Sequence, residues 1–541
     1  MSDTELKPLP LGTSDFSTLR KRNQIYVDKT ALVYELASRP EKFFLARPRR
    51  FGKSLLMSTF ESLFKYGLRD FNGLDIEHLW KEKDTYQVVK LDFSRIKPGN
   101  DAAKFSADFD EYLTFCFGEI GFQRASYGSI NNQIERFFRG LPCSSLVLLI
   151  DEYDAPLTAC MNNVPLFNTV RKSLSDFYAV IKSNDSVFRF FFMTGITKFS
   201  KASIFSELNN LSDISLASEY GSLLGYTREE LKRYFDGYLN QAAKVLNLSK
   251  ENLVSELTKN YDGFCFEKTA KQHLFAPWSL LKFFSCPSNG FENYWYESAG
   301  NPIALQPYLK SYSLREPEDY FKPKFIPIPL LQATATDVEH INDLALLTQA
   351  GYLTIKGVGT DSFLVGYPNK EVADSLAWLY REKLLSSQSI DQLGAMHLRK
   401  DLQEGNIDSV VDQINKLFLA TDYTRYPVND EITCRNYLQL FLTLGAFVRT
   451  YAELHNALGR SDLELETSRL HWVFEIKFLK NGNKGEEQKL PEAERLLKTA
   501  VAQIKERHYG ESDLSGKKLI RVALVYSEKD RQFVRWSRAG I

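Results

Sequence analysis

Residues 42–56 read KFFLARPRRFGKSLL, and this stretch decides the fold. The run KFFLA predicts a short buried strand, and Gly52, Lys53 and Ser54 then open a helix that continues to about residue 65. Backbone N–H groups at a helix start have no helical partner, and the helix dipole favours an anion there. Strand, Gly-Lys-Ser and helix in this order predict a phosphate-binding loop on an α/β sheet.

The loop has one unusual position. Lys53 is placed to reach the β- and γ-phosphates of a nucleotide, and the Ser54 hydroxyl to bind Mg²⁺. Arg47 stands where such loops carry their first glycine, which normally supplies unusual backbone angles, so this loop must turn differently. The neighbouring Arg49 and Arg50 give the loop positive charge that could meet phosphates, although solvated charge is the default interpretation.

Two further strands end in polar residues. SLVLLIDEYD at 145–154 is an apolar strand that ends at Asp151, a carboxylate that could hold Mg²⁺ through water. Glu152 follows and is placed to polarise an attacking water as a general base. The strand in VFRFFFMTGIT, 187–197, carries Thr194, a candidate sensor of the γ-phosphate. Strand ends are often merely solvated, but the combination with Gly-Lys-Ser favours ATP binding.

The order of the elements predicts the fold class. Strands alternate with helices up to about residue 220, which is typical of a mostly parallel sheet. From residue 226 amphipathic helices dominate, and 343–385 reads as helix, two strands around a glycine turn and helix, an order that suits a winged helix-turn-helix. Such a unit can touch DNA, but packing inside a large ATPase is the more common use. The polar stretch 479–494 is expected to be a mobile loop.

The C-terminal segment predicts a second site. It reads as a helix at 430–446, three strands, a helix at 491–508 and a strand at 518–527. Asp462 lies on the middle strand of the three, and Glu475 and Lys477 lie two apart on the next, so they share a face. Asp462 and Glu475 could chelate Mg²⁺ or Mn²⁺, while Lys477 orients a water or stabilises phosphorane charge. Alternating charge on a surface strand is the ordinary alternative, and His471 is interpreted as a solvent-facing polar residue.

The exact residues of the motifs also indicate a protein family, which their chemistry alone does not. YVDKT, LARPRRFGKSLL, LIDEYDAPL and TGITKFSKASIFSELNNLSDIS resemble the bacterial AAA-ATPase-like family, relatives of the archaeal and STAND-type P-loop ATPases. The resemblance spans about residues 9–380 and implies ATP binding and hydrolysis. Arginine commonly precedes Gly-Lys-Ser in that family, so Arg47 resembles a family variant. Ala276 departs from it, since relatives usually have Asn before Pro-Trp.

A second resemblance covers about residues 400–541. GRSD followed by FEIK resembles the PD-(D/E)XK nuclease domain often fused to such ATPases. It implies Asp462, Glu475 and Lys477 as the catalytic core. Further positions carried over or considered near this core are Glu431 on the preceding helix, Glu453 on the first strand, and Gln503 and Tyr509 of an accessory motif.

Composition limits the partners. The chain has 541 residues with 68 basic and 68 acidic side chains, so any nucleic-acid surface must be a local patch. Six cysteines without metal-ligand spacing, no apolar signal core and only short apolar runs predict a soluble cytoplasmic protein with no membrane partner. We expect a homo-oligomer, ATP and Mg²⁺ as cofactors with Mn²⁺ as an alternative at the second site, and DNA rather than RNA as the nucleic acid.

These observations predict three domains: a P-loop ATPase at 1–220, a helical and winged-helix region at 221–390, and a restriction-endonuclease-like α/β domain at 391–541. The leading hypothesis is an ATP-binding, metal-dependent DNA nuclease, with defence against phage or foreign DNA as an association only. Two alternatives remain: a nucleotide-switched oligomerising scaffold that binds nucleic acid without cutting, and an RNA-directed nuclease.

Overall fold

The computed structural model describes most of the chain. The described residues are 6–99, 101–161, 163–196, 208, 210–295, 315, 317–332, 342–384, 398–421, 423, 427–446, 449–452, 455–456, 459–467, 469–480, 486–510 and 517–539. The chain divides into two compact units, Met1–Ser375 and Leu376–Ile541, each with its own sheet and core. No helix of these described residues is both long and apolar enough to cross a membrane.

The first unit is built on a five-stranded parallel sheet of order β2-β3-β4-β1-β5. Its strands are β1 Lys42–Ala46, β2 Gln87–Asp92, β3 Leu146–Asp151, β4 Phe188–Gly195 and β5 Leu211–Asp213. β3 is buried at every position, which explains why its sequence is continuously apolar rather than alternating. Because these strands are parallel, the carboxyl ends of β1, β3 and β4 meet at one edge of the sheet, as their sequences predict.

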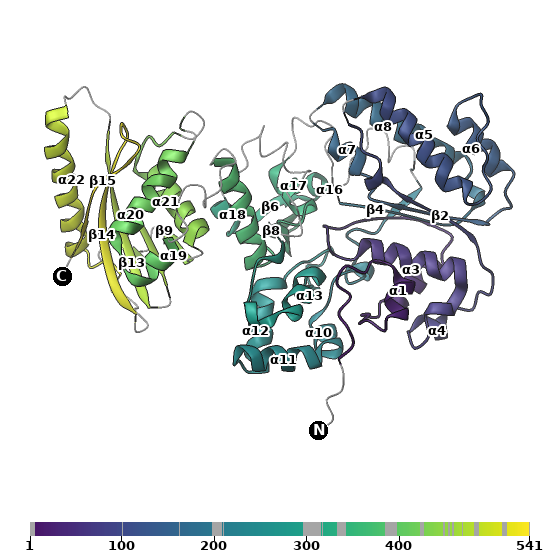
Figure 1. Ribbon diagram of the computed structural model, residues 1–541, viewed down its shortest axis with the longest axis horizontal. Coiled ribbons are helices and arrows are strands. Elements are labelled where there is room, and N and C mark those ends of the chain that lie inside the picture. Colours follow the sequence, from purple (N-terminus) through teal and green to yellow (C-terminus); the bar gives the residue numbers. More distant parts are fainter. Residues whose placement is uncertain are drawn as a thin grey trace. The chain divides into compact units, whose positions relative to one another are not determined.

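Helices cover both faces of this sheet (Figure 1). On one side lie α1 Phe16–Lys21, α3 Lys53–Tyr66 and α4 Ile76–Leu79, and on the other α5 Ala102–Gly118, α6 Ile130–Arg139, α7 Ala155–Ala159 and α8 Val164–Ser183. α2 spans Thr30–Ala37. The helices thus bury the apolar surface of both sheet faces, which is how a parallel sheet is usually stabilised.

A helical group follows within the same unit. It comprises α10 Arg228–Tyr234, α11 Asp236–Leu246, α12 Lys250–Tyr261 and α13 Pro277–Ser285. Thr227 caps α10 through a reciprocal bond with Glu230, as the Thr-x-x-Glu spacing predicts. Phe235, Leu257 and Phe283 are among the fully buried residues of the core that these helices share.

The winged region has one strand more than the sequence indicated. Its elements are β6 Lys324–Pro327, α16 Ile328–Gln332, α17 Asp343–Gln349, β7 Thr354–Val358, β8 Ser362–Gly366 and α18 Lys370–Leu384. β6 pairs with β8 to give a three-stranded sheet of order β6-β8-β7. Four residues of α17, Leu344 to Leu347, are buried, so this helix packs inside the protein.

The second unit is a five-stranded mixed sheet of order β15-β14-β13-β12-β9 between two helical layers (Figure 1). Its strands are β9 Arg449–Ala452, β12 Leu463–Glu466, β13 Leu470–Leu479, β14 Lys518–Ser527 and β15 Gln532–Arg538, with a separate pair β10 His455–Asn456 and β11 Gly459–Arg460. One face packs on α19 Leu398–Glu404, α20 Ile407–Ala420 and α21 Glu431–Ala446, and the other on α22 Glu486–Glu506.

Two expectations about this unit were wrong. The polar stretch 479–494 is not a loop throughout, because α22 already begins at Glu486 and contains Pro491. The proline suggested a helix start at 491, but one proline costs one hydrogen bond and the helix continues through it. The final strand β15, which pairs antiparallel with β14, was not predicted.

Candidate functional sites

The first candidate site is a cavity of about 530 Å³ at the carboxyl edge of the parallel sheet. Its lining comes from residues 10–14, the loop after β1, the end of β3 and the start of α13. The residues of the loop and strand end that line it are Arg49, Arg50, Gly52, Lys53, Ser54 and Glu152. This volume lies in the range of small-molecule and cofactor sites.

Arg47 explains how the loop turns without its usual glycine. Its side chain is 1% exposed and does not line the first cavity; it donates from Nη1 to the Ser215 carbonyl at 2.6 Å and from Nη2 to the Tyr220 carbonyl at 3.3 Å. The guanidinium also lies 4.6 Å from the Phe266 ring centroid. Burial lowers the pKa of Arg47 to about 9. Arg47 thus ties the loop to the segment after β5, while positive φ angles at Arg50 and Gly52 turn the chain.

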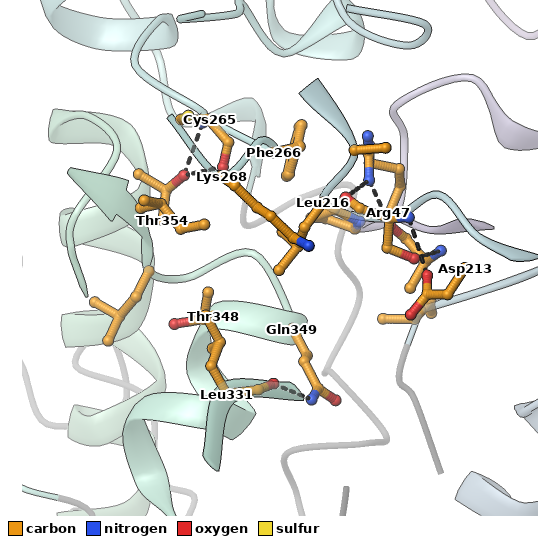
Figure 2. A pocket seen from close by; sticks show the side chains of 17 residues that line it. Arg47, Asp213, Leu216, Cys265, Phe266, Lys268, Leu331, Thr348, Gln349 and Thr354 are labelled. Carbon is orange, nitrogen blue, oxygen red and sulfur yellow. Dashed lines mark hydrogen bonds between the residues drawn. The ribbon is translucent and has the colours of Figure 1, made fainter. Parts of the chain in front are cut away.

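Behind the loop lies a second cavity of about 150 Å³ within the same unit (Figure 2). Arg47 and Pro48 form one wall, and Thr348, Thr354 and Ile355 of the winged region form another. Gly351 approaches so closely that a Cβ there would lie 2.6 Å from Pro48 Cβ. The winged region therefore packs directly on the back of the loop.

Lys53 and the acids after β3 form the polar centre of the first cavity. Lys53 Nζ donates to the carbonyls of Arg47 and Pro48, each at 2.9 Å. Asp151 is 4% exposed, and the Ser54 hydroxyl hydrogen-bonds its carboxylate. Burial raises the pKa values of Asp151 and Glu152 and lowers that of Lys53. The structure therefore brings Gly52, Lys53, Ser54, Asp151 and Glu152 to one place.

The remaining predicted residues of this site differ in their settings. Arg50 is exposed, with Cζ 4.5 Å from the Trp278 ring centroid. Thr194 lies on β4 between β1 and β3, but its buried hydroxyl donates to the Leu45 carbonyl at 2.8 Å. Asp154 was missed: it is 2% exposed, and its carboxylate accepts from the Ile196 N–H at 3.1 Å. The Asp-x-x-Asp spacing after β3 was the available indication.

The second candidate site lies where β12 and β13 meet. Asp462 Oδ2 accepts a hydrogen bond from the Ile476 N–H at 2.8 Å, which fixes the carboxylate against β13. Glu475 is 0% exposed, and its Oε1 accepts from Lys477 Nζ at 2.7 Å. Burial, and then the charge of Asp462, raise the pKa of Glu475 to about 7. The two carboxyl groups therefore interact electrostatically, although Asp462 lies one residue before β12 and not on a strand as the sequence predicted.

The ammonium group of Lys477 contacts several oxygen atoms of this site. Its Nζ also donates to the Ile476 carbonyl at 3.1 Å and lies 3.6 Å from Glu431 Oε1. Burial alone would lower the pKa of Lys477, but its pairing with Glu475 outweighs that effect and raises it. Glu431 begins α21, and burial raises the pKa of its carboxyl. Of the predicted residues, Glu453 lies outside the described residues.

One observation indicates that a metal ion fits this donor set: Glu475 Oε2 is buried and has no hydrogen-bond partner among the described residues. The Lys477 ammonium already contacts Glu475 Oε1 and the Ile476 carbonyl, which are hard oxygens suited to Mg²⁺ or Mn²⁺. Among the described residues, however, no three His, Cys, Asp or Glu side chains form a metal-holding group. Asp462 and Glu475 would supply the carboxylates, and other ligands would come from backbone or solvent.

The interpretation of His471 as solvent-facing was wrong. His471 is 5% exposed, and its Nε2 lies 2.7 Å from Glu464 Oε2. Ser461 donates from Oγ to Glu464 Oε1 at 2.7 Å, so a buried chain connects β13 to the residue before Asp462. Sequence alone could not show this, because the pairing of β12 with β13 decides which residues share a face.

A parallel sheet with a Gly-Lys-Ser loop and an acidic strand end defines a P-loop ATPase, and the second sheet carries the Asp, Glu and Lys of a nuclease-type centre. Residues 10–205 match the family described as predicted AAA-ATPase, and residues 431–536 match the PD-(D/E)XK nuclease superfamily. A protein of Azotobacter chroococcum mcd 1, named as an uncharacterized protein in the vnfD 5'region, is 32% identical over 383 residues, covering 68% of this chain and 69% of the relative. No solved structure matches.

The chain belongs to the AAA-ATPase-like family and carries a C-terminal domain of the PD-(D/E)XK nuclease superfamily. The two matched segments fall in different compact units, so the first and second candidate sites belong to the ATPase-like and nuclease-like parts respectively. Both domains indicate an enzyme with ATPase and nuclease potential.

Proposed function

We propose that the protein binds and hydrolyses ATP in its first unit and cleaves DNA phosphodiesters with Mg²⁺ in its second. The observation that carries the nuclease half is the buried Glu475 Oε2 beside Asp462 and Lys477, an atom without a hydrogen-bond partner in the part of the chain that the structure describes. A carboxylate oxygen without a partner inside a protein is costly unless a cation or proton meets it. The nucleotide half is supported by Lys53, Ser54 and Glu152 around one cavity, and by the hydrogen bond from Ser54 to Asp151.

In the nucleotide site each residue has a distinct proposed role. The Lys53 ammonium, held by two loop carbonyls, neutralises phosphate charge, with Arg49 and Arg50 adding to it. Ser54 and Asp151, already hydrogen-bonded to each other, are the pair that would hold Mg²⁺. Glu152 orients the attacking water, and its raised pKa suits a group that accepts a proton. Thr194 is the proposed sensor of the γ-phosphate, because its strand β4 lies between β1, which leads into the loop, and β3, which ends at Asp151.

In the second site the residues bind and orient the phosphodiester. Mg²⁺ or Mn²⁺ would supply Lewis acidity and a more acidic bound water. Asp462 and Glu475 would hold the cation, and Asp462 is oriented by the Ile476 N–H. Lys477 orients the water or stabilises charge that develops on the phosphate. Glu431, Glu453, Gln503 and Tyr509 are proposed as accessory residues around this core.

The cellular setting remains part of the proposal. We infer a cytoplasmic homo-oligomer that acts on DNA rather than RNA, in defence against phage or foreign DNA. The support is the association of an ATPase with a nuclease on one chain, which is an argument from architecture.

The test compares wild-type protein with Lys53→Ala and Asp462→Ala on linear, circular and single-stranded DNA and on RNA, with Mg²⁺ or Mn²⁺, with and without ATP. We expect DNA cleavage by wild type that Asp462→Ala abolishes, and ATP hydrolysis that Lys53→Ala abolishes. ATP-dependent assembly with nucleic-acid binding but no cleavage would favour a scaffold instead. Cleavage restricted to RNA would favour an RNA-directed nuclease.

A further inference from the structure

The end of α22 carries a polar cluster centred on one hydroxyl. Tyr509 Oη lies 3.3 Å from Gln503 Nε2 and 3.1 Å from Arg507 Nη1. Gln503 and Arg507 are four residues apart and lie on the same side of the helix end, while Tyr509 is 1% exposed. Arg507 itself is exposed. A buried tyrosine therefore holds a surface guanidinium at a defined position.

The chain after α22 is shaped to place Tyr509 there. His508 has a φ of 50° and Gly510 a φ of 79°, so the backbone reverses on both sides of the tyrosine. A Cβ on Gly510 would lie 2.6 Å from Val473 Cγ2, which makes the close approach to β13 specific to glycine. The buried Arg521 on β14 donates from Nε to the Tyr509 carbonyl at 2.8 Å. Tyr509 is thus fixed by its backbone as well as by packing.

The cluster lies beside the second candidate site. α22 packs on the face of β13 that carries Val473, and by strand alternation Glu475 and Lys477 share that face. The hydrogen bond to Tyr509, and to a smaller extent the charge of Glu475, raise the pKa of Arg507. A guanidinium has five N–H donors in a planar fork that matches phosphate oxygens. Arg507 thus brings a phosphate-matching cation to the acidic site.

We propose that Arg507 is a phosphate-binding residue of the nuclease-like site, and that Gln503 and Tyr509 are positioning residues that hold its guanidinium. This inference rests on the proposed nuclease function and names a contact to the substrate backbone that the Asp, Glu and Lys core does not provide. Arg507 binds a non-bridging phosphate oxygen of the polynucleotide, next to the carboxylates that hold the cation. Sequence recognition is not required of it, since a phosphate contact carries no base information.

Kinetics on a DNA substrate cut by the wild-type chain test the proposal with Arg507→Ala, Arg507→Lys and Tyr509→Phe. Loss of one charge-assisted hydrogen bond predicts a rise of about 10-fold to 100-fold in KM for Arg507→Ala. Arg507→Lys should recover part of the affinity, and Tyr509→Phe should shift KM in the same direction by less. The slope of log affinity against log salt should fall by about 1 for Arg507→Ala.

Arg495→Ala is the matched control, because Arg495 lies on the same helix with Nη2 3.8 Å from Glu492 Oε1 and outside the Tyr509 cluster. It should leave KM and the salt slope unchanged. Equal KM and salt slope in Arg507→Ala and wild type, with Asp462→Ala inactive, would overturn this proposal and leave the nuclease function standing. If wild type does not cut, metal-free binding of a DNA oligonucleotide decides: weaker binding by Arg507→Ala supports the phosphate contact, and equal binding or none overturns it.

Discussion

The two candidate sites each contain a lysine, buried in the first site and partly buried in the second, and the partners of these lysines are different in kind. Lys53 donates to two neutral carbonyls of its own loop, with Arg49 and Arg50 nearby. Lys477 contacts the carboxylate of Glu475 at 2.7 Å, and Asp462 and Glu431 add negative charge around it.

This difference predicts the sign of each ligand. The loop side of the first site presents cationic side chains and unpaired helix-start N–H groups, so it is suited to an anion. Counted over the described residues, the second site has more carboxylates than cationic groups within contact, and one carboxylate oxygen has no partner there, so the site is suited to a further cation. The following predictions test this contrast.

Glu475→Gln is expected to give the largest effect. It keeps the size of the side chain but removes the charge that attracts a cation, so cleavage should fall by about 10³-fold while ATP hydrolysis stays at the wild-type rate. Cleavage and ATPase assays on the same preparation measure both. A comparable loss of ATPase activity would contradict the assignment of opposite charge preferences to two independent sites.

Arg47→Gly would give the loop its usual glycine, yet we expect it to destabilise the first unit. The buried guanidinium satisfies the carbonyls of Ala46, Ser215 and Tyr220, and removing it leaves these groups and a void behind the loop. We expect a loss of about 3 kcal/mol in the free energy of unfolding, together with weaker ATP binding. Urea denaturation and nucleotide titration measure the two effects, and Arg50→Gly is the exposed control for the stability measurement alone. Greater stability of Arg47→Gly would show that Arg47 destabilises the loop and does not fix it to the segment after β5.

Gly351→Ala tests the contact between the winged region and the loop. The added Cβ would meet Pro48 at 2.6 Å, and the φ of 84° at this residue is unfavourable for alanine. We expect a destabilisation of about 2 kcal/mol and weaker ATP binding, with cleavage by the second site unchanged when ATP is absent. Gly73→Ala, which has a similar φ of 75° and open space around its Cβ, controls for backbone strain. Equal ATP affinity in the two variants would exclude the Pro48 contact as the cause.

The strands and motifs of both sites could be predicted because their information is local. β1, β3 and β4 are continuous apolar runs, and Gly-Lys-Ser or Glu-x-Lys fixes residues within a few positions of each other. Arg47 and His471 could not be placed in this way. They bind Tyr220 and Glu464, and these contacts depend on chain segments that meet only in the folded protein. The start of α22 was missed because a polar segment with a proline has no apolar periodicity to predict a helix.

Glu371 provides a smaller, pH-dependent test within the first unit, and it is not among the residues that line the first cavity. It is 3% exposed and accepts hydrogen bonds from Ser279 Oγ at 2.9 Å and from the Tyr294 and Trp295 N–H groups at 2.8 Å. Burial raises its pKa from 4.5 to about 8, so at neutral pH the folded protein keeps this carboxyl mostly protonated, while the unfolded chain ionises it.

Unfolding near neutral pH therefore releases a proton from Glu371. Its contribution to stability is fully present below about pH 4.5 and is lost as the pH rises towards 8, with a slope of up to about 1.4 kcal/mol per pH unit. Glu371→Gln should remove this slope, so wild type and variant should differ most in their dependence between pH 5 and 8, as urea denaturation at several pH values would show. Parallel curves would mean that the three donors keep Glu371 ionised in the folded state. The first unit would then hold a buried carboxylate anion by hydrogen bonds alone. Its interior would therefore not exclude charge in general, and such an exclusion could not explain why Lys53 is held by carbonyls while Lys477 is held by carboxylates.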